Sequence, residues 1–222
     1  MSKKGRPQIT APQHMNGAPT LHAPAHGVRS VCVYCGSGAG EGPAYAEAAR
    51  TLGRSLGENG VRLVYGGGGL GLMGEVARAA LDAGGEVTGI IPSFLVEREH
   101  MLREVTDLMV TTDMHERKKL MFDRSDAFVA LPGGIGTLEE LVEQLTWAQL
   151  GQHTKPIVVA NIANFWDPFL ALLEHMRNEA FIRRGLEVRF GVVSEAAQIL
   201  PRVTELYAEL GGKVAPGVLA KF

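Results

Sequence analysis

The sequence predicts an α/β fold, namely a doubly wound, Rossmann-like parallel sheet flanked by helices in a single domain. Short apolar runs alternate with amphipathic helical patterns from residue 28 to residue 210, and this alternation is typical of parallel sheets. Three of the apolar runs end in glycine turns, near Gly36, Gly66 and Gly133. Ligands of such sheets bind beyond the carboxyl ends of the strands, so we expect the three turns to meet at one edge.

The composition is that of an ordinary globular protein. The chain has 222 residues, of which 45% are hydrophobic and 21% are charged, enough for one domain with a sizeable core. A formal net charge of -2 argues against a general nucleic-acid-binding role. No apolar run approaches the roughly 20 residues that span a bilayer. We therefore expect a cytoplasmic protein with no membrane contact.

The two ends of the chain differ from its middle. Residues 1–27 are rich in Pro, Ala, Gly and His and lack the apolar stretch of a secretory signal. We expect them to form a disordered N-terminal arm. Residues 211–222 are expected to form a loose C-terminal tail. The sequence between them, residues 28–210, shows no internal repeat and no linker.

The first expected strand, Ser30 to Tyr34, leads into a glycine turn and then a helix over residues 44–59. Cys32 and Cys35 form a C-x-x-C pair at the end of this strand. A glycine turn follows them instead of the helix start of a redox motif, and no second pair completes a zinc site. Two structural thiols are the favoured interpretation, with a redox or metal role as the alternative. Ser37 either donates to a ligand or caps the turn.

The second expected strand, Val61 to Tyr65, runs into the glycines of residues 66–74 and a helix that ends near Ala83. Gly69-x-Gly71-x-x-Gly74 matches the dinucleotide fingerprint. The next strand, residues 87–91, lacks the acidic residue that would bind the ribose hydroxyls. A standard NAD site is therefore not favoured. No G-K-[ST] follows the glycines, so the turn is not a Walker A loop either.

A short strand over residues 108–111 precedes a helix over residues 113–125, which starts with the capping-box pattern Asp113-x-x-Glu116. At about 100° per residue, Arg117 shares a face with Met114, Met121 and Ser125. An arginine on an apolar stripe needs an anionic partner. That partner is either a carboxylate in a buried ion pair or a bound phosphate or carboxylate ligand.

The central stretch is the apolar strand of residues 127–131, the turn Pro132-Gly133-Gly134-Ile135-Gly136, and a helix that ends near Leu150. Bare N–H groups and the positive end of the helix dipole favour a phosphate at this turn. Thr137-x-x-Glu140 has the spacing of a capping box, with Thr137 as the cap. Alternatively, Glu140 faces a bound sugar phosphate as an acid, a base or a stabiliser of positive charge. The three glycines favour the second interpretation, because a plain cap does not need them.

Two further strands and two further helices complete the expected fold. We expect a strand over residues 155–160, buried on both faces, and a helix over residues 165–179. A last strand over residues 188–193 and a last helix over residues 195–210 follow. The side chains expected to point inward from the helix of residues 165–179 are Phe169, Leu172, Leu173 and Met176.

Two paired motifs carry a resemblance to a known family. Met114-His115-x-Arg117-Lys118, followed by Pro132-Gly133-Gly134-x-Gly136-Thr137-x-x-Glu140, resembles the LONELY GUY family of cytokinin riboside 5′-monophosphate phosphoribohydrolases, which are often mislabelled lysine decarboxylases. The resemblance covers residues 28–210 and includes Cys35-Gly36-Ser37, Tyr65-Gly66-Gly67-Gly68, Gly71-Leu72-Met73-Gly74 and Thr146-Trp147-Ala148-Gln149.

The resemblance implies hydrolysis of the N-glycosidic bond of a purine nucleoside monophosphate, AMP or its N6-modified form, to free base and ribose 5-phosphate. It implies Arg117 and Glu140 as the catalytic pair, a homodimer with sites near the interface, and no cofactor or metal. Residues expected to contact the substrate are Glu99, Arg117, Lys118, Gly133, Gly134, Ile135, Gly136, Thr137 and Thr146. We add Ser37, Gly66, Gly67 and Met73 from the two earlier glycine turns.

Two competing functions remain at this point. One is a nucleotide-binding module of the same fold without catalysis, but binding a phosphate does not call for a carboxylate such as Glu140 beside it. The other is a pyridoxal-dependent lysine decarboxylase, for which no lysine stands in a recognisable Schiff-base setting. Intact substrate that raises thermal stability would favour the binding module.

Overall fold

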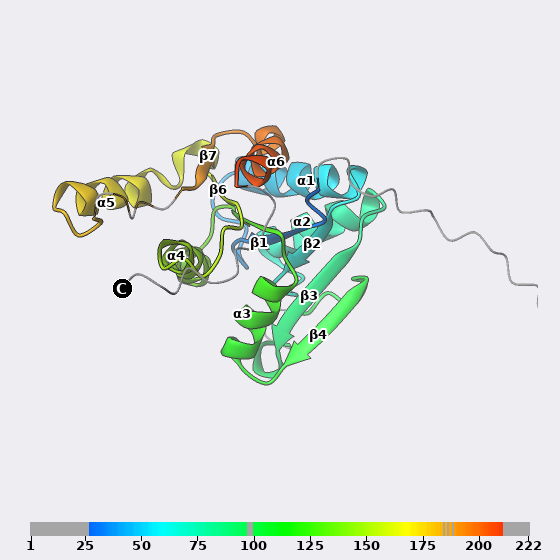
Figure 1. Cartoon of the computed structure of the whole chain (residues 1–222). Coiled ribbons are helices and arrows are strands. Elements are labelled where there is room, and N and C mark those ends of the chain that lie inside the picture. Colours follow the sequence, from blue (N-terminus) through cyan, green and yellow to red (C-terminus); the bar gives the residue numbers. More distant parts are fainter. Residues whose placement is uncertain (1–26, 97–99, 184, 186, 188, 211–222) are drawn as a thin grey trace, which may run out of the picture.

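The computed structural model describes residues 27–96, 100–183, 185, 187 and 189–210 (Figure 1). Nearly all of the expected N-terminal arm and the whole expected C-terminal tail lie outside these residues. Within the described part of the chain, seven parallel strands form one sheet in the order β4-β3-β2-β1-β5-β6-β7. The predicted doubly wound parallel sheet is confirmed.

The strands agree closely with the apolar runs of the sequence, because parallel strands that are buried on both faces consist almost wholly of apolar residues. Their bounds are β1 Ser30–Tyr34, β2 Arg62–Tyr65, β3 Val87–Pro92, β4 Asp107–Thr111, β5 Ala127–Ala130, β6 Ile157–Ala160 and β7 Gly191–Val193. β1 lies at the centre, with Val31 opposite Leu63 of β2 on one side and Ala127 of β5 on the other. The order in which strands are added to the sheet therefore reverses at β1, and such sheets bind their ligands at this point.

Helices cover both faces of the sheet (Figure 1). α1 Pro43–Glu58, α2 Gly71–Asp82 and α6 Ile199–Glu209 lie on one face, and α3 Met114–Asp123 and α4 Ile135–Gln149 lie on the other. Three short 3-10 turns, η1 Ser93–Leu95, η2 Ile162–Asn164 and η3 Ala196–Gln198, join elements. Along β1, Val31 and Val33 join the core under α1, α2 and α6, whereas Cys32 and Tyr34 join the core under α3 and α4.

The glycines of the fingerprint-like turn after β2 bring backbones together. A Cβ at Gly71, where φ is +54°, would collide with the backbone of Ser37 and Gly38. One at Gly74 would collide with the carbonyl of Gly69, and one at Gly69 with that of His100. These glycines are therefore required for close packing between neighbouring loops. Their match to the dinucleotide fingerprint is explained without a dinucleotide.

α5, Asp167–Asn178, differs from the expectation. Figure 1 shows it extending outward past the β6 and β7 side of the sheet. Within this helix, all of which the structure describes, no side chain is buried, and Leu172 and Met176 are 48% and 36% exposed. The prediction that the side chains point into the core was wrong for Leu172 and Met176. Leu173 is half-buried, and Phe169 is half-buried and packs against the core under α3 and α4. An apolar helical stripe shows that a helix has a partner, but it does not show which one.

None of the helices among the described residues is long and apolar enough to cross a membrane.

Candidate active site

The three glycine turns meet at the carboxyl edge of the sheet, as predicted. The Gly36 N–H donates to the Pro132 carbonyl at 3.1 Å, and the Met73 N–H donates to the Gly36 carbonyl at 3.3 Å. Between them and the start of α3 lies a cavity of about 340 Å³. It is lined by residues from the turns after β1, β2 and β5, from η1, and from α3 and α4. This is the place where the fold concentrates the predicted functional residues.

The start of α4 forms one wall of the cavity. Gly134 is the N-cap residue, with an extended backbone and no side-chain cap, and Gly134, Ile135 and Gly136 are exposed. The first N–H groups of a helix have no partner within it, so those that follow Gly134 are free to bind an anion. Thr137 is a residue of the first turn and does not cap the helix. The interpretation of Thr137-x-x-Glu140 as a capping box is therefore wrong, because the helix begins at Ile135, three residues earlier than that pattern requires.

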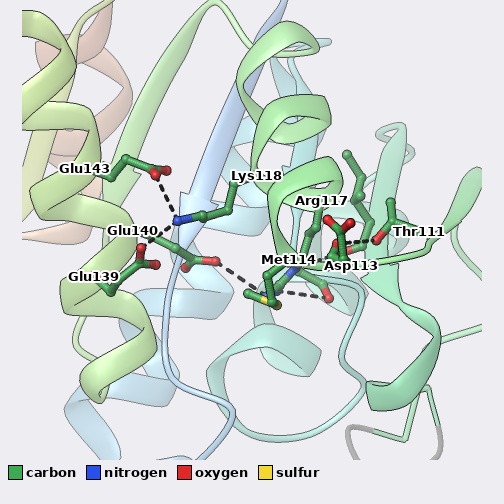
Figure 2. A network of polar contacts seen from close by, with 10 residues as sticks. Thr111, Asp113, Met114, Arg117, Lys118, Glu139, Glu140 and Glu143 are labelled. Atoms are coloured by element: carbon green, nitrogen blue, oxygen red, sulfur yellow. Dashed lines mark hydrogen bonds and ion pairs between the residues drawn. The ribbon is translucent and has the colours of Figure 1, made fainter.

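Glu140 lies in the second turn of α4 and is 8% exposed. Its Oε1 atom is 3.6 Å from Nη1 of Arg117 (Figure 2). Burial is the largest influence on this carboxyl group and raises its pKa from 4.5 to about 7; the charge of Arg117 opposes the rise. Desolvation penalises a buried carboxylate in this way. Glu140 is therefore a buried acid that changes charge near neutral pH and lines a cavity.

Arg117 is held by α3 in a fixed orientation. Its Nε atom donates to the Ile90 carbonyl at 3.1 Å, and Nη2 donates to the Gly66 carbonyl at 3.4 Å. A Cβ at Gly66 would collide with the guanidinium, so a side chain there would have to displace Arg117. Both interpretations of Arg117 from the sequence remain compatible with this geometry, because the guanidinium forms a buried ion pair and also lines the cavity.

The start of α3 confirms one predicted cap. The Asp113 carboxylate accepts a hydrogen bond from the Glu116 N–H at 2.9 Å, and this bond lowers the pKa of Asp113. Glu116 reaches back to the N–H of Thr112 at 2.8 Å, one residue earlier than the usual box. This cap fixes where α3 begins and therefore where Arg117 points.

Lys118, the neighbour of Arg117, turns toward α4 (Figure 2). Its Nζ atom lies 2.6 Å from Oε1 of Glu139 and 2.8 Å from Oε1 of Glu143. Lys118 is not among the described residues that line the cavity. Burial alone would lower the pKa of Lys118, but the hydrogen bonds to the two glutamates raise it.

The other predicted residues fall into three groups. Gly134, Ile135, Gly136 and Thr137 line the cavity, as do Ser37, Gly66 and Met73. Gly67 and Gly133 do not; Gly67 packs on Ile91, and a side chain at Gly133 would collide with Thr137. Thr146 lies elsewhere, in a groove between α4 and α5, with its hydroxyl donating to the Val142 carbonyl at 2.7 Å. Glu99 lies outside the described residues.

Some residues that line the cavity were not predicted from the sequence. Leu95, Met114 and Glu139 are the main ones, with Tyr34 and Cys35 at the end of β1. Two signals were available: Met114 lies one turn before Arg117 on the same helical face, and Glu139 precedes Glu140. Leu95 had no comparable signal, since it lies in η1, outside any periodic pattern.

The two cysteines are buried and free. Burial raises the pKa of both thiols, so they stay protonated at neutral pH. Cys32 belongs to the core under α3 and α4, and Cys35 to the core on the opposite face. The structural interpretation of the C-x-x-C pair is supported. Within the described ranges, no group of three or more His, Cys, Asp or Glu side chains is arranged to hold a metal ion.

Curated relatives cover most of the chain. It is 43% identical over 199 residues to a probable cytokinin riboside 5′-monophosphate phosphoribohydrolase of Oryza sativa subsp. japonica, covering 90% of this chain and 89% of that protein. It is 47% identical over 187 residues to the enzyme of that name from Arabidopsis thaliana, covering 84% and 86%. The chain belongs to the LONELY GUY family. A bacterial member from Rhodococcoides fascians is 48% identical over 155 residues, covering 69% of this chain and 78% of its own.

The family model described as "Possible lysine decarboxylase" matches residues 73–203. Among solved structures, the molybdenum cofactor carrier protein of Chlamydomonas reinhardtii matches with a TM-score of 0.60 and 23% identity, covering 82% of this chain and 98% of that one. The molybdenum cofactor binding protein of Rippkaea orientalis matches with a TM-score of 0.61 and 21% identity, covering 80% and 96%. At this identity the two structures show that the LONELY GUY fold is shared, and no more.

Proposed function

We propose that this LONELY GUY protein hydrolyses the N-glycosidic bond of purine nucleoside 5′-monophosphates and releases the free base and ribose 5-phosphate. The observation that carries the proposal is the position of Glu140, a buried carboxyl group in the wall of a cavity that also contains an uncapped helix start. The names of the relatives, cytokinin riboside 5′-monophosphate phosphoribohydrolases, support the same reaction. They also support an N6-modified adenine as the base.

The start of α4 is the proposed phosphate site. The exposed residues Gly134, Ile135 and Gly136 place backbone N–H groups and the positive end of the helix dipole at the cavity. Binding energy at the phosphate, remote from the reacting carbon, fixes the ribose beside Glu140. Ser37, from the turn after β1, lines the cavity too and is available as a hydroxyl donor.

Glu140 is the proposed catalytic residue. Cleavage of a glycosidic bond passes through a transition state with positive charge on the sugar. The ionised carboxylate stabilises this charge and accepts a proton from the attacking water. The C1′–oxygen bond forms as the C1′–nitrogen bond breaks, and the base leaves with the electron pair and takes up a proton. Arg117, at 3.6 Å, favours the ionised form of Glu140.

The base is proposed to lie against the apolar part of the cavity. Met73 of α2, Leu95 of η1 and Met114 of α3 supply this part. Flexible, polarisable side chains such as methionine adapt to irregular ligands. Leu95→Ser should therefore lower kcat/KM for isopentenyladenosine monophosphate more than for AMP, because it removes apolar contact from the base end. Equal losses for both substrates would place the N6 substituent elsewhere.

A homodimer is proposed from the groove between α4 and α5. The groove has a volume of about 480 Å³, and apolar side chains line it, including Val142 of α4 at 41% exposed and Phe181, which follows α5, at 84%. A second copy of the chain would bury this surface. Thr146 lies in the same groove, so its expected role in substrate binding would require the dimer. Sedimentation velocity should show a dimer for the wild type and a monomer for Phe181→Asp.

The proposed reaction is tested by ribose 5-phosphate release from AMP and from isopentenyladenosine monophosphate. Release from either substrate supports the hydrolase, and the ratio gives the base preference. Substrate that stays intact but raises the melting temperature would support a nucleotide-binding module instead.

The two buried free thiols support a cytoplasmic location, where thiols stay reduced.

A further inference from the structure

The turn after β2 consists of four consecutive glycines, residues 66–69, and the first of them, Gly66, lines the cavity. Glycine loses more conformational freedom on folding than any other residue, and these four have no side chains with which to fix the turn. The position of the turn therefore depends on donors from other elements that hold its carbonyl groups.

An exposed arginine of α2 holds the far end of this turn. Nη2 of Arg78 donates to the carbonyl of Gly69 at 2.7 Å. Gly69 is buried, and a buried carbonyl group that loses its partner is costly. A Cβ at Gly74 would collide with Nη1 of Arg78, so the bare backbone of Gly74 makes room for the guanidinium. The contact of Arg78 with the turn thus depends on a glycine one helical turn earlier in α2.

The near end of the turn is held by Arg117. The Gly66 carbonyl accepts a hydrogen bond from Nη2 of Arg117 at 3.4 Å, and Nη1 of Arg117 lies 3.6 Å from Oε1 of Glu140 (Figure 2). Between the two ends, the Leu102 N–H donates to the Gly67 carbonyl at 3.1 Å. Two guanidinium groups therefore hold opposite ends of one glycine turn, and a shift of the turn moves the acceptor that orients Arg117.

Arg78 does not reach the cavity itself. It is absent from the described residues that line the cavity, and it lies instead in a surface groove between α1 and α2, beside Arg50, Arg54 and Glu75. Direct contact with the substrate is therefore not its role. Its route to the reacting groups is the glycine turn.

We propose that Arg78 is a positioning residue for the reaction. By fixing the Gly69 carbonyl, it holds the turn in the place where the Gly66 carbonyl orients Arg117. This inference rests on the proposed function, in which Arg117 acts on Glu140. Loss of the Arg78 guanidinium frees the far end of the turn, and Arg117 then loses a fixed acceptor for one of its hydrogen bonds.

The test is a double-mutant cycle of Arg78→Met and Arg117→Met, measured as kcat/KM for the release of ribose 5-phosphate. Arg78→Met alone should lower kcat/KM on the order of tenfold, because residues in one hydrogen-bond network commonly couple by this much. In the Arg117→Met background, the same substitution should change kcat/KM by less than about twofold. The group that Arg78 positions is already absent from that background.

Two further variants separate positioning from a general loss of structure. Arg78→Lys keeps a cationic N–H donor at this place and should restore most of the activity. Arg54→Met is the matched control, because Arg54 is exposed and lines the same surface groove; its loss should leave kcat/KM unchanged. If circular dichroism shows that Arg78→Met does not fold, Arg78→Ala takes its place in the cycle.

Two results would overturn the proposal. One is a loss of equal size for Arg78→Met in both backgrounds, as expected of a residue that only stabilises the fold. The other is full activity in Arg78→Met.

A second readout keeps this test separate from the proposed function, which fails if the wild type releases no ribose 5-phosphate. The Nε–H group of Arg117 donates to the Ile90 carbonyl, and its NMR signal is assigned with Arg117→Met. In Arg78→Met the chemical shift of this signal should change and its hydrogen exchange should become faster. An unchanged signal would show that Arg78 does not position Arg117.

Discussion

Arginine and glutamate form ion pairs at both ends of the sheet, but the two arrangements differ. At the amino ends of the strands, Arg62 of β2 pairs with Glu86 at 2.5 Å and also with Asp107 of β4. At the carboxyl ends, Arg117 and Glu140 pair at the longer distance of 3.6 Å. The Arg62 side chain is 29% exposed, whereas those of Arg117 and Glu140 are both 10% exposed.

The difference separates a pair that joins strands from a pair at the proposed reaction site. Arg62 has close partners on both sides and partial access to water, so its charges are well compensated. Glu140 is buried with one distant cation, and its pKa is raised to about 7. A poorly compensated buried carboxylate is costly to the fold, and active sites commonly keep such groups. Substitutions at the two ends should therefore have opposite consequences.

The largest expected effect is the loss of activity in Glu140→Gln. Glutamine keeps the size of the side chain and can still accept a hydrogen bond from Arg117, but it carries no charge. We expect kcat to fall by roughly 10²–10³-fold, the usual cost of one preorganised group. Ribose 5-phosphate release measures the fall, and circular dichroism confirms that the variant is folded. Unchanged turnover would make Glu140 a structural residue of α4.

Arg117→Met should have the next largest effect, and one that depends on pH. Removing the guanidinium takes away the charge that lowers the pKa of Glu140, so more of the carboxyl group is protonated at pH 7. We expect a loss in kcat/KM on the order of 10²-fold at pH 7. At pH 9, where Glu140 is ionised again, the loss should be smaller. A loss that is equal at both pH values would assign Arg117 to direct contact with the substrate.

Glu140→Gln should also change the stability of the fold, in the opposite direction from its effect on activity. The pKa of Glu140 is higher in the folded protein, about 7, than its ordinary value of 4.5. The folded state therefore holds a proton that the unfolded state releases, and wild-type stability falls as pH rises between these values. The unfolding free energy of the variant relative to that of the wild type should therefore increase by on the order of 3 kcal/mol from pH 4.5 to pH 8. Chemical denaturation at the two pH values measures this.

If the unfolding free energies of the variant and the wild type differ by the same amount at both pH values, the pKa of the Glu140 carboxyl group is not raised by folding.

The smallest effect is expected at the other end of the sheet. Arg62→Gln removes hydrogen bonds that join the starts of β2, β3 and β4. Because the pair is partly exposed, we expect a loss of about 1 kcal/mol in unfolding free energy, smaller at high salt, and an unchanged kcat/KM. A change in kcat/KM would mean that the two clusters are coupled through the sheet.

How far the sequence predicts this molecule depends on the kind of contact. Buried parallel strands are apolar runs, so β1 is predicted residue by residue, and the meeting of the three glycine turns follows from topology. The start of α4 was misplaced because Thr137-x-x-Glu140 and a glycine N-cap at Gly134 give similar local patterns. The prediction that Leu172 and Met176 of α5 point inward was wrong, because an apolar stripe on a helix does not show which surface packs against it. The pairing of Lys118 with Glu139 and Glu143 depends on how α3 packs against α4, which no local pattern shows.

The central position of β1 has a consequence for the order in which the molecule forms. Ser30, the first residue of β1, donates its N–H to Asp126, 96 residues later, just before β5. The cavity has walls on both sides of this junction, so it cannot exist before β5 has paired with β1. Contacts so distant along the chain form slowly, because a long loop must close first. The start of α4 must therefore have left the ribosome before a growing chain can form the cavity.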